Sequence, residues 1–562
     1  MKHWVASVSL ILTCFNSFAQ DIAVGTWRTH FSYSNARIIE ITPDKIFCAV
    51  ENGLFSREIS SGEVRRLSKI DGLADTGIST MKYDELNRVL VIGYESGFVD
   101  FIYEDRILTV SEVANTNLDD SKTINDIAFS DSQTFLATDL GIIVVNTSNA
   151  VISENFVQIG TEGSAVDVLE ITTLDDSLIV RTNQGIQSGN LSSNLLDFNS
   201  WNQYLLTSSF RSLTRVESVI YALDSNNLMR LTGGNWEDTG IDLPIGADKL
   251  FRIGSELYTA TNDGFVYQLS SNDFVNVIQV AAQSINDLDF VGTTLLIADG
   301  NIGLTDEEGN LLSPSGPLSD NFSNFRVVSN DVFGFHAPSP FGYDGSENQP
   351  NFSVFSEGSW EIQSIEGFGN VSDAVSFNGN LYYSSIGKGI YNESSSQIER
   401  LGIEGVDSVI VNIAAGESLW VSSFGSNNPI YLLNRDDQWT SLTSTELFDN
   451  QFLTIDLSQI EVAWLGSASG SISVFNKDEN TTELINSSDG VPSSFTDIEI
   501  TVEDNAWIST LRGPALFPSA SFVSSDQSAI RPTFENRVLF EDEQVNAIIT
   551  DGGNNVWFGT EN

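Results

Sequence analysis

The sequence predicts an all-β protein made of two consecutive β-propellers, each expected to have seven blades, with the second incomplete at its C-terminus. Three observations predict this fold. A strand–turn–strand pattern returns about every 42 residues, a bulky apolar residue stands at a fixed distance before each turn, and no long stretch has helical periodicity. A period of about 40–45 residues made of short strands is typical of one four-stranded propeller blade, so helical repeats of similar length are excluded.

The first marker is a tight polar turn between two apolar runs, as in VLVIGYESGFVDF and TFLATDLGIIVV. Such a turn needs a backbone that tolerates positive φ, which Gly provides and Asn accepts. The first four positions are 44 residues apart, and two less regular turns are expected near residues 344 and 429. The predicted turn residues are Gly53, Gly97, Gly141, Gly185, Asn227, Gly264, Gly303, Gly389, Gly470 and Gly513.

The second marker is a bulky apolar residue six positions before each turn residue. A large apolar side chain at a constant offset predicts a buried position in the strand that leads into the hairpin. The predicted core residues are Phe47, Val91, Phe135, Ile179, Tyr221, Tyr258, Ile297, Tyr383, Trp464, Trp507 and Trp557. For Trp557 the matching turn position is 563, one residue beyond the sequence.

A third marker is a Trp that precedes the next turn by 26 to 31 residues and is expected to be packed. These are Trp27, Trp201, Trp236, Trp360 and Trp439. The tripeptides DGL at residues 71–73 and DGV at residues 489–491 follow these Trp segments or lie at the same point of the repeat elsewhere.

The predicted domains are a signal peptide at 1–19, a first propeller at 20–320 and a second propeller at 321–562. The boundary is placed where residues 314–350 hold five of the 12 prolines, because proline is poorly tolerated inside sheets. The second ring is expected to lack about one blade, so that its last strands leave an exposed edge.

The N-terminus, MKHWVASVSLILTCFNSFAQ, is typical of a secretory signal with cleavage after Ala19. Lipidation of Cys14 is an alternative, although Thr13 fits a lipoprotein box poorly. Cleavage leaves Cys48 as the one cysteine, so no intramolecular disulfide is expected. No other apolar run is long enough to predict a transmembrane segment.

The charge is strongly negative, with 26 Lys plus Arg against 76 Asp plus Glu and a net charge of −50. Such a surface repels phosphate backbones, so no nucleic-acid partner is expected. Adaptation for solubility is the favoured interpretation. Divalent cations held by acidic loops are the alternative, but no calcium-binding loop motif supports it. We expect no metal site and no cofactor.

No catalytic residues are predicted, because the sequence has no HExxH or GxSxG motif and no Cys–His pair at a supporting distance. A glycosidase needs only two carboxylates, so 76 acids leave that chemistry open. His30, beside Arg28 and Tyr33, could bind an anionic sugar, although a structural role in a first strand is favoured. We therefore predict a protein that is not an enzyme and leave its ligand-binding residues unknown.

The stretches SSDGVPSSFTDIEITVEDNAWIST and QVNAIITDGGNNVWFGTEN resemble the two-component regulator propeller repeat, whose usual form is GLP followed by V..I..D..GN.W.GT..GL. The match is close at 543–562. The opening GTWRTHFSYSNA, placed after a signal peptide and before a degenerate propeller, resembles the PorZ family of the type IX secretion system of Bacteroidetes. This resemblance covers residues 21 to 562.

The resemblance implies two seven-bladed propellers followed by a C-terminal β-sandwich sorting domain, which would lie beyond Asn562. It implies a non-enzymatic protein on the outer face of the outer membrane, with PorU, PorV and PorQ as partners in the attachment complex. Such proteins bind anionic lipopolysaccharide and help to deliver it to the PorU sortase, which joins it to cargo. No family binding motif transfers ligand residues to this sequence.

Two alternatives remain open at this point. The chain could be the periplasmic, glycan-sensing propeller half of a hybrid two-component regulator, which uses the same repeats. It could also be a propeller hydrolase or lyase acting on carbohydrate.

Overall fold

The structure is a computed structural model that describes residues 28–562 except for 117–120, 206–208, 226, 282–283, 346–350, 400–408, 493, 525–526 and 561–562. The predicted signal peptide at residues 1–19, Cys14 and Trp27 lie outside the described residues.

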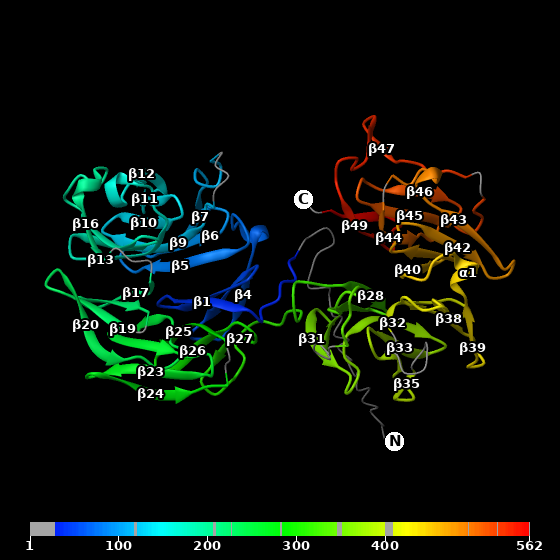
Figure 1. The fold of residues 1–562 in the computed structure, drawn as a ribbon, viewed down its shortest axis with the longest axis horizontal. Helices are drawn as coiled ribbons and strands as arrows, with labels where there is room; N and C mark the ends of the chain where they lie inside the picture. The colour runs from blue at the N-terminus through cyan, green and yellow to red at the C-terminus, as the bar shows by residue number, and fades with distance from the viewer. Residues whose placement is uncertain are drawn as a thin grey trace, which may run out of the picture. The chain divides into compact units, whose positions relative to one another are not determined.

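The first propeller contains seven antiparallel sheets within the described chain, arranged around a common centre (Figure 1). Each sheet is called a blade below. In chain order the blades are β1 (Ala36–Ile41), β2 (Lys45–Val50), β3 (Leu54–Glu58), β4 (Val64–Leu67); β5 (Ile78–Asp84), β6 (Val89–Tyr94), β7 (Val99–Ile102), β8 (Ile107–Val110); β9 (Ile124–Ser130), β10 (Gln133–Thr138), β11 (Gly141–Asn146), β12 (Val151–Phe156); β13 (Val168–Leu174), β14 (Ser177–Thr182), β15 (Gly185–Asn190), β16 (Trp201–Leu205); β17 (Phe210–Val216), β18 (Val219–Asp224), β19 (Asn227–Thr232), β20 (Asn235–Asp242); β21 (Leu250–Ile253), β22 (Glu256–Ala260), β23 (Phe265–Ser270), β24 (Asp273–Gln279); and β25 (Ile285–Val291), β26 (Thr294–Asp299), β27 (Gly303–Asp306).

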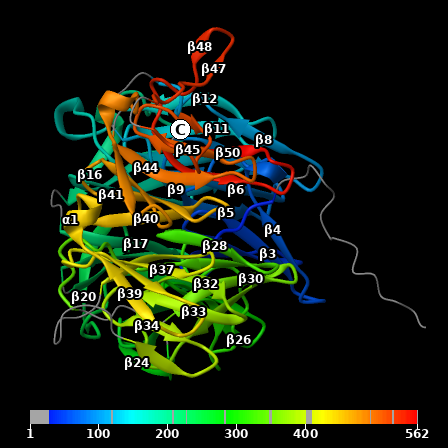
Figure 2. The same cartoon turned by 90° about the vertical axis from the view of Figure 1, so that its right-hand side faces the viewer.

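The second propeller contains six blades within the described chain. They are β28 (Asn324–Val328), β29 (Asp331–Phe335), β30 (Asn351–Ser356), β31 (Ser359–Ser364); β32 (Val371–Phe377), β33 (Asn380–Ser385), β34 (Gly389–Asn392), β35 (Gln397–Glu399); β36 (Ile410–Ala415), β37 (Leu419–Ser423), β38 (Ile430–Leu433), β39 (Trp439–Leu442); β40 (Phe452–Leu457), β41 (Val462–Ser467), β42 (Ile472–Asn476), β43 (Thr481–Ile485); β44 (Phe495–Ile500), β45 (Asn505–Thr510), β46 (Ala515–Pro518); and β49 (Val545–Thr550), β50 (Val556–Thr560). A hairpin of β47 (Thr533–Phe534) and β48 (Arg537–Val538) stands away from these blades (Figures 1 and 2).

Within a blade the strands follow one another as a meander, and the first strand is innermost, because the first strands of successive blades contact each other. Helical structure in the described chain is limited to single turns. These are η1 (Lys69–Asp71), η2 (Thr161–Gly163), η3 (Phe198–Ser200), α1 (Ser444–Leu447) and η4 (Ser487–Asp489). The predicted fold class, all-β with two consecutive propellers, is confirmed.

The passage from one propeller to the other falls near residue 310. By their internal contacts, residues 37–298 and 305–310 group with the first propeller, and residues 311–562 group with the second, together with 31–36 and 299–304. The change of unit thus comes about ten residues before the predicted boundary at 320.

The predicted turn residues lie between the second and third strands of their blades or at the start of the third strand. Eight of them have positive φ: Gly97, Gly141, Gly185, Gly264, Gly303, Gly389, Gly470 and Gly513. Gly53 differs, because it is not among the described residues with positive φ. Its turn spans three residues and closes through a 2.9 Å hydrogen bond from the Val50 N–H to the Gly53 carbonyl, without a left-handed residue. Asn227 is the first residue of β19 and pairs with Asp224.

The predicted core residues all lie in the second strand of a blade. Tyr221 and Trp507 are half-buried, and eight are buried: Phe47, Val91, Phe135, Ile179, Tyr258, Ile297, Tyr383 and Trp464. Trp557 differs from the expectation, with 46% of its surface exposed. It lies in the sheet β49–β50, which has two strands in the described chain, and its Nε1 donates to Asp551 Oδ2 at 3.0 Å.

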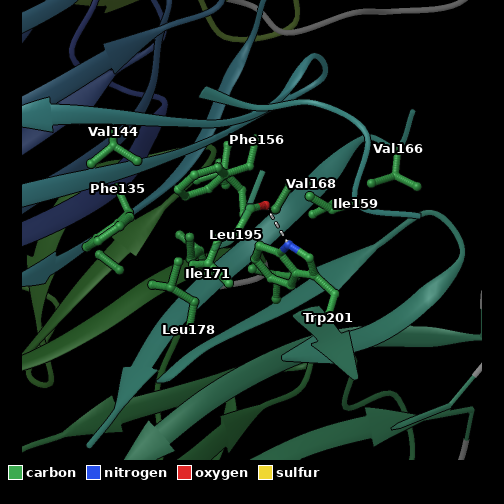
Figure 3. Packing of buried hydrophobic residues seen from close by; sticks show 14 residues of the cluster. Phe135, Val144, Phe156, Ile159, Val166, Val168, Ile171, Leu178, Leu195 and Trp201 are labelled. Atoms are coloured by element: carbon green, nitrogen blue, oxygen red, sulfur yellow. Dashed lines mark hydrogen bonds between the residues drawn. The ribbon is translucent and has the colours of Figure 1, made fainter. Parts of the chain in front are cut away.

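The tryptophans of the third marker lie in the outermost, fourth strands of their blades. Within the described chain these are Trp201, Trp236, Trp360 and Trp439. Trp201 lies in the apolar cluster between the third and fourth blades, where it packs near Phe156 and its Nε1 donates to the Leu195 carbonyl at 3.0 Å (Figure 3). The Trp therefore buries a large apolar surface at the rim of two blades and keeps its N–H satisfied.

The two "DG" steps form 3-10 turns that enter a new blade. Gly72 and Gly490 follow η1 and η4 with φ of 105° and 87°, a left-handed conformation that favours glycine. Each turn then places an apolar residue, Leu73 or Val491, into the packing between blades. In the described part of the chain, no helix is long and apolar enough to cross a membrane.

Candidate functional site

The innermost strands share a short pattern that joins each blade to the next. In β9 it runs Ile124, Asn125, Asp126, Ile127, with an apolar residue at positions one and four and a polar acceptor at position three. The strand pairing shifts register beside the first position in nine of the described inner strands, which is the mark of a β-bulge: β5, β9, β13, β17, β32, β36, β40, β44 and β49. The bulge and the third-position acceptor occur together in several blades, for example in β9, β32 and β44.

The acceptor takes a hydrogen bond from a backbone N–H in the inner strand of the following blade. We call this contact an inter-blade latch. For example, Asp126 Oδ2 of β9 accepts a hydrogen bond from the Ile171 N–H of β13 at 2.9 Å. The others with a third-position acceptor are Ser212 with Leu250 (3.1 Å), Asp287 with Ile39 (2.9 Å), Asp373 with Ile413 (3.1 Å), Asn412 with Ile455 (3.0 Å) and Asp497 with Ile548 (3.2 Å).

A second row of latches uses the fifth position of the same strands. Glu40 accepts from the Tyr83 N–H at 2.9 Å, Asp456 from Ile500 at 2.6 Å, and Glu499 from Thr550 at 3.0 Å. The latches satisfy N–H groups that face a neighbouring blade and have no sheet partner there. Carboxylates near the centre of each ring are therefore occupied in holding blades together.

In the first propeller, burial raises the pKa values of a group of acids that come from the first and seventh blades. Burial raises the pKa of Glu40 to about 8 and that of Asp289 to about 6, and it also raises the pKa of Asp287. The hydrogen bond from the Tyr83 N–H and the charge of the nearby Lys82 oppose this rise in the pKa of Glu40. Beside them Lys82 Nζ pairs with Asp126 at 2.9 Å, and Arg181 Nε pairs with Glu170 at 2.6 Å.

In the second propeller, one guanidinium is shared by several acids. Arg326 of β28 binds Asp373 of β32 through two bonds, Nε–Oδ1 at 2.9 Å and Nη2–Oδ2 at 2.6 Å. Asp373 is fully buried and also accepts from the Asn412 amide at 2.9 Å. Burial raises the pKa of Asp456 to about 7 and that of Asp497 to about 6, while the charge of Arg326 opposes both shifts.

Carboxyl groups with raised pKa values are a common mark of catalytic acids, but structural networks shift pKa values as well. Here Glu40, Asp456 and Asp497 each accept a latch hydrogen bond, which gives a structural reason for their position. Among the residues that the structure describes, no group of three or more His, Cys, Asp or Glu side chains could hold a metal ion. The geometry of the inner strands therefore supports a structural role for these carboxylates, which hold neighbouring blades together.

A second feature is a basic region on the first blade. Arg28 Nε donates to His30 Nε2 at 3.1 Å, and burial together with the charges of Arg28 and Arg66 lowers the pKa of His30. Neither Arg28 nor His30 lies in a strand, so the expected position of His30 in a first strand is wrong, and a structural role for it stays a prediction. Arg28 and His30 were named from the sequence, but Arg57 and Arg66 were missed; the pair of arginines in VRRL was the available signal for Arg66.

Tyr33, the third member of that sequence cluster, lies elsewhere. It is 3% exposed and packs where Gly303 and Gly316 leave no room for a side chain. His336 is likewise engaged, with Nδ1 2.8 Å from the Asn321 carbonyl and Nε2 3.0 Å from Ser353 Oγ. Cys48 is a free, buried thiol whose pKa is raised by burial, as expected for an unreactive core cysteine.

The two series of consecutive antiparallel blades define the class of protein, a tandem β-propeller. Residues 46–202 match the family model described as the N-terminal β-propeller domain of PorZ from the type IX secretion system. Among solved structures, PorZ of Porphyromonas gingivalis, described as an essential bacterial surface component of that system, has 18% sequence identity and a TM-score of 0.77. The match covers 95% of this chain and 80% of that chain. The resemblance to PorZ is thus confirmed.

Two further structures come from B. thetaiotaomicron. The extracellular domain of a proposed one-component system has 14% identity and a TM-score of 0.37, and covers 94% of this chain and 81% of that chain. The extracellular domain of a proposed hybrid two-component system has 13% identity and a TM-score of 0.39, and covers 94% and 74%. At these TM-scores neither likeness carries an argument. No match is found among curated proteins.

Proposed function

We propose that this protein is a non-catalytic surface component of the type IX secretion attachment complex. In this role it binds anionic lipopolysaccharide and presents it to the sortase, with the sortase-complex proteins as partners on the outer face of the outer membrane. The observation that carries the proposal is the match of residues 46–202 to the PorZ propeller model, supported by the shared fold over nearly the whole chain.

The chemistry of the rings is consistent with a scaffold. The central carboxylates serve as latches, and the described residues offer no metal-binding cluster. A set of rigid blades that presents loops and edges suits a protein that brings a ligand and an enzyme together.

Affinity purification of the tagged protein from its native cells tests the proposal. We expect a sortase-complex protein and lipopolysaccharide to co-purify after mild detergent extraction, and neither to co-purify with a tagged periplasmic protein of similar charge. Deletion of the protein should leave cargo without attached lipopolysaccharide. A preparation that contains neither the sortase complex nor lipopolysaccharide contradicts the proposal, and recovery of a histidine kinase in its place favours the two-component sensor.

A further inference from the structure

The first blade differs in charge from the rest of the chain. Its four strands and their turns, residues 36–67, hold five Arg and Lys against five Asp and Glu, whereas the full sequence holds 26 against 76. A region of balanced charge on a strongly negative protein is where an anionic ligand meets less repulsion than elsewhere. The first blade is therefore the place to look for an anion-binding surface.

Two of the cations, Arg57 and Arg66, lie on one face of the blade. In the β3–β4 pair, Phe55 lies opposite Arg66, and Arg57 lies opposite Val64. Opposite residues share a face and alternate residues return to it, so Arg57 and Arg66 point to the same side. The charge of Arg66 acts on His30, which in turn accepts a hydrogen bond from Arg28. Arg28, His30, Arg57 and Arg66 are called the basic face below.

Most other cations of this blade already have acidic partners. Arg37 pairs with Glu51 at 3.2 Å, Lys45 with Glu58 at 3.1 Å, and Lys69 with Asp75 at 3.0 Å. Arg57 differs, since its guanidinium forms no ion pair or hydrogen bond with any residue that the structure describes. Its Nη2 lies over Gly62, 3.0 Å from where a Cβ of that residue would stand.

We propose that the basic face binds an anionic group of a glycan. The inference rests on the proposed function and gives it a location. Guanidinium groups bind phosphate and carboxylate oxygens with paired, charge-assisted hydrogen bonds, and Arg57 and Arg66 provide two such groups on one side of the sheet. His30 adds a polar ring near Arg66. The ligand class is a sugar carrying phosphate or carboxylate.

The test uses the mature protein and the variants R57Q, R66Q and R57Q/R66Q. R88Q is the matched control, because Arg88 is an exposed arginine in a turn of the next blade. Probes are a phosphorylated lipopolysaccharide core oligosaccharide, its dephosphorylated form, a galacturonate oligomer and single-stranded DNA, each titrated by calorimetry. Thermal unfolding of each variant shows that it is folded.

We expect each single substitution to weaken binding of the anionic oligosaccharide about tenfold, and the double substitution more, with R88Q unchanged. If the protein binds the phosphorylated oligosaccharide but not its dephosphorylated form, phosphate is the group recognised. Tight binding of the galacturonate oligomer identifies carboxylate as the group recognised. Equal binding by all variants overturns the inference while lipopolysaccharide presentation stands. Binding of galacturonate alone, lost in the double variant, supports the basic face and contradicts lipopolysaccharide as the ligand. Preference for DNA, or no binding of any probe, overturns the inference.

Discussion

The carboxylate of Asp287 accepts a hydrogen bond from the backbone N–H of Ile39 at 2.9 Å, although 248 residues separate the two in sequence. Asp287 lies in the inner strand of the seventh blade and Ile39 in that of the first. This latch joins the two ends of the first ring, using the same chemistry that joins blades that are consecutive in sequence. Ring closure in this propeller thus relies on a side chain that meets a backbone group.

Replacement of Asp287 by Ala should therefore weaken the first propeller. The Ile39 N–H would be left without its acceptor, at a cost of about 1–3 kcal/mol. Asp287→Asn keeps an acceptor oxygen for the Ile39 N–H but turns its NH2 group toward the Leu288 N–H, from which Oδ1 accepts at 3.0 Å, so it should cost less than Asp287→Ala without being neutral. Differential scanning calorimetry with limited proteolysis measures both effects. An Ala variant as stable and as protease-resistant as the Asn variant would show that this latch does not hold the ring closed.

Lowering the pH from 8 to 5 should stabilise the protein. Burial raises the pKa of Glu40 to about 8 and the pKa values of Glu170 and Asp456 to about 7. An acid whose folded pKa exceeds its unfolded pKa binds a proton more tightly when folded, so stability rises as the pH falls through the folded pKa. The gain is complete below the unfolded value near 4.5. We expect the Tm to rise by several degrees across this window.

General charge repulsion among 76 acidic residues also weakens on acidification, so a control is needed. Glu40→Gln should flatten the pH dependence of the first propeller's transition, whereas substitution of the exposed Glu85 should leave it unchanged. If E40Q and wild type keep the same slope, the carboxyl of Glu40 is not the titrating group.

The fold was predictable because its signals are local and repeated. Gly141 and Gly185 mark turns by conformation, and Phe135 and Ile179 mark buried strands by size, so the period of a blade can be counted from the sequence alone. The latches were not predicted. Asp126 is one of several polar residues in its strand, and its partner is a backbone N–H 45 positions away that no side-chain pattern reveals.

The basic region was predictable only in part, for a similar reason. Arg28 and His30 are neighbours in sequence, whereas Arg57 and Arg66 join them through strand pairing. Tyr33 was grouped with His30 by proximity in sequence, but the chain carries it to a separate, buried position. Proximity in sequence was a poor guide where the chain is not in a strand.

Arg326→Met should destabilise the second propeller strongly. The substitution leaves the fully buried carboxylate of Asp373 without the guanidinium that binds it at 2.6 and 2.9 Å. An uncompensated buried charge costs about 3–5 kcal/mol. The double variant R326M/D373N removes that charge and should recover part of the loss, because the new NH2 group meets one of the donors that Asp373 accepts from. Thermal unfolding of the single and double variants measures the coupling, and a double variant no more stable than R326M would contradict the ion-pair interpretation.

Gly141→Ala should destabilise the third blade by more than its backbone conformation alone explains. Gly141 has φ of 105°, and a Cβ there would stand 2.4 Å from the Phe156 carbonyl oxygen. Gly246, with φ of 90° and nothing within 4 Å of its Cβ position, is the matched control. Gly246→Ala should cost only the left-handed strain, about 1–2 kcal/mol, and Gly141→Ala clearly more. Equal costs in chemical denaturation would mean that the Phe156 backbone moves aside.

Trp464 and Trp557 occupy the same phase of the repeat and should respond very differently to truncation. Trp464 is fully buried, packs against Phe517 and donates from Nε1 to the Ala520 carbonyl at 3.0 Å. Trp464→Ala removes these contacts and opens a cavity, so we expect a loss of about 3–5 kcal/mol. Trp557 is 46% exposed, and Trp557→Ala should cost less than about half of that. Urea unfolding followed by circular dichroism compares the two variants, and equal losses would show that exposure does not decide what this repeat position contributes to stability.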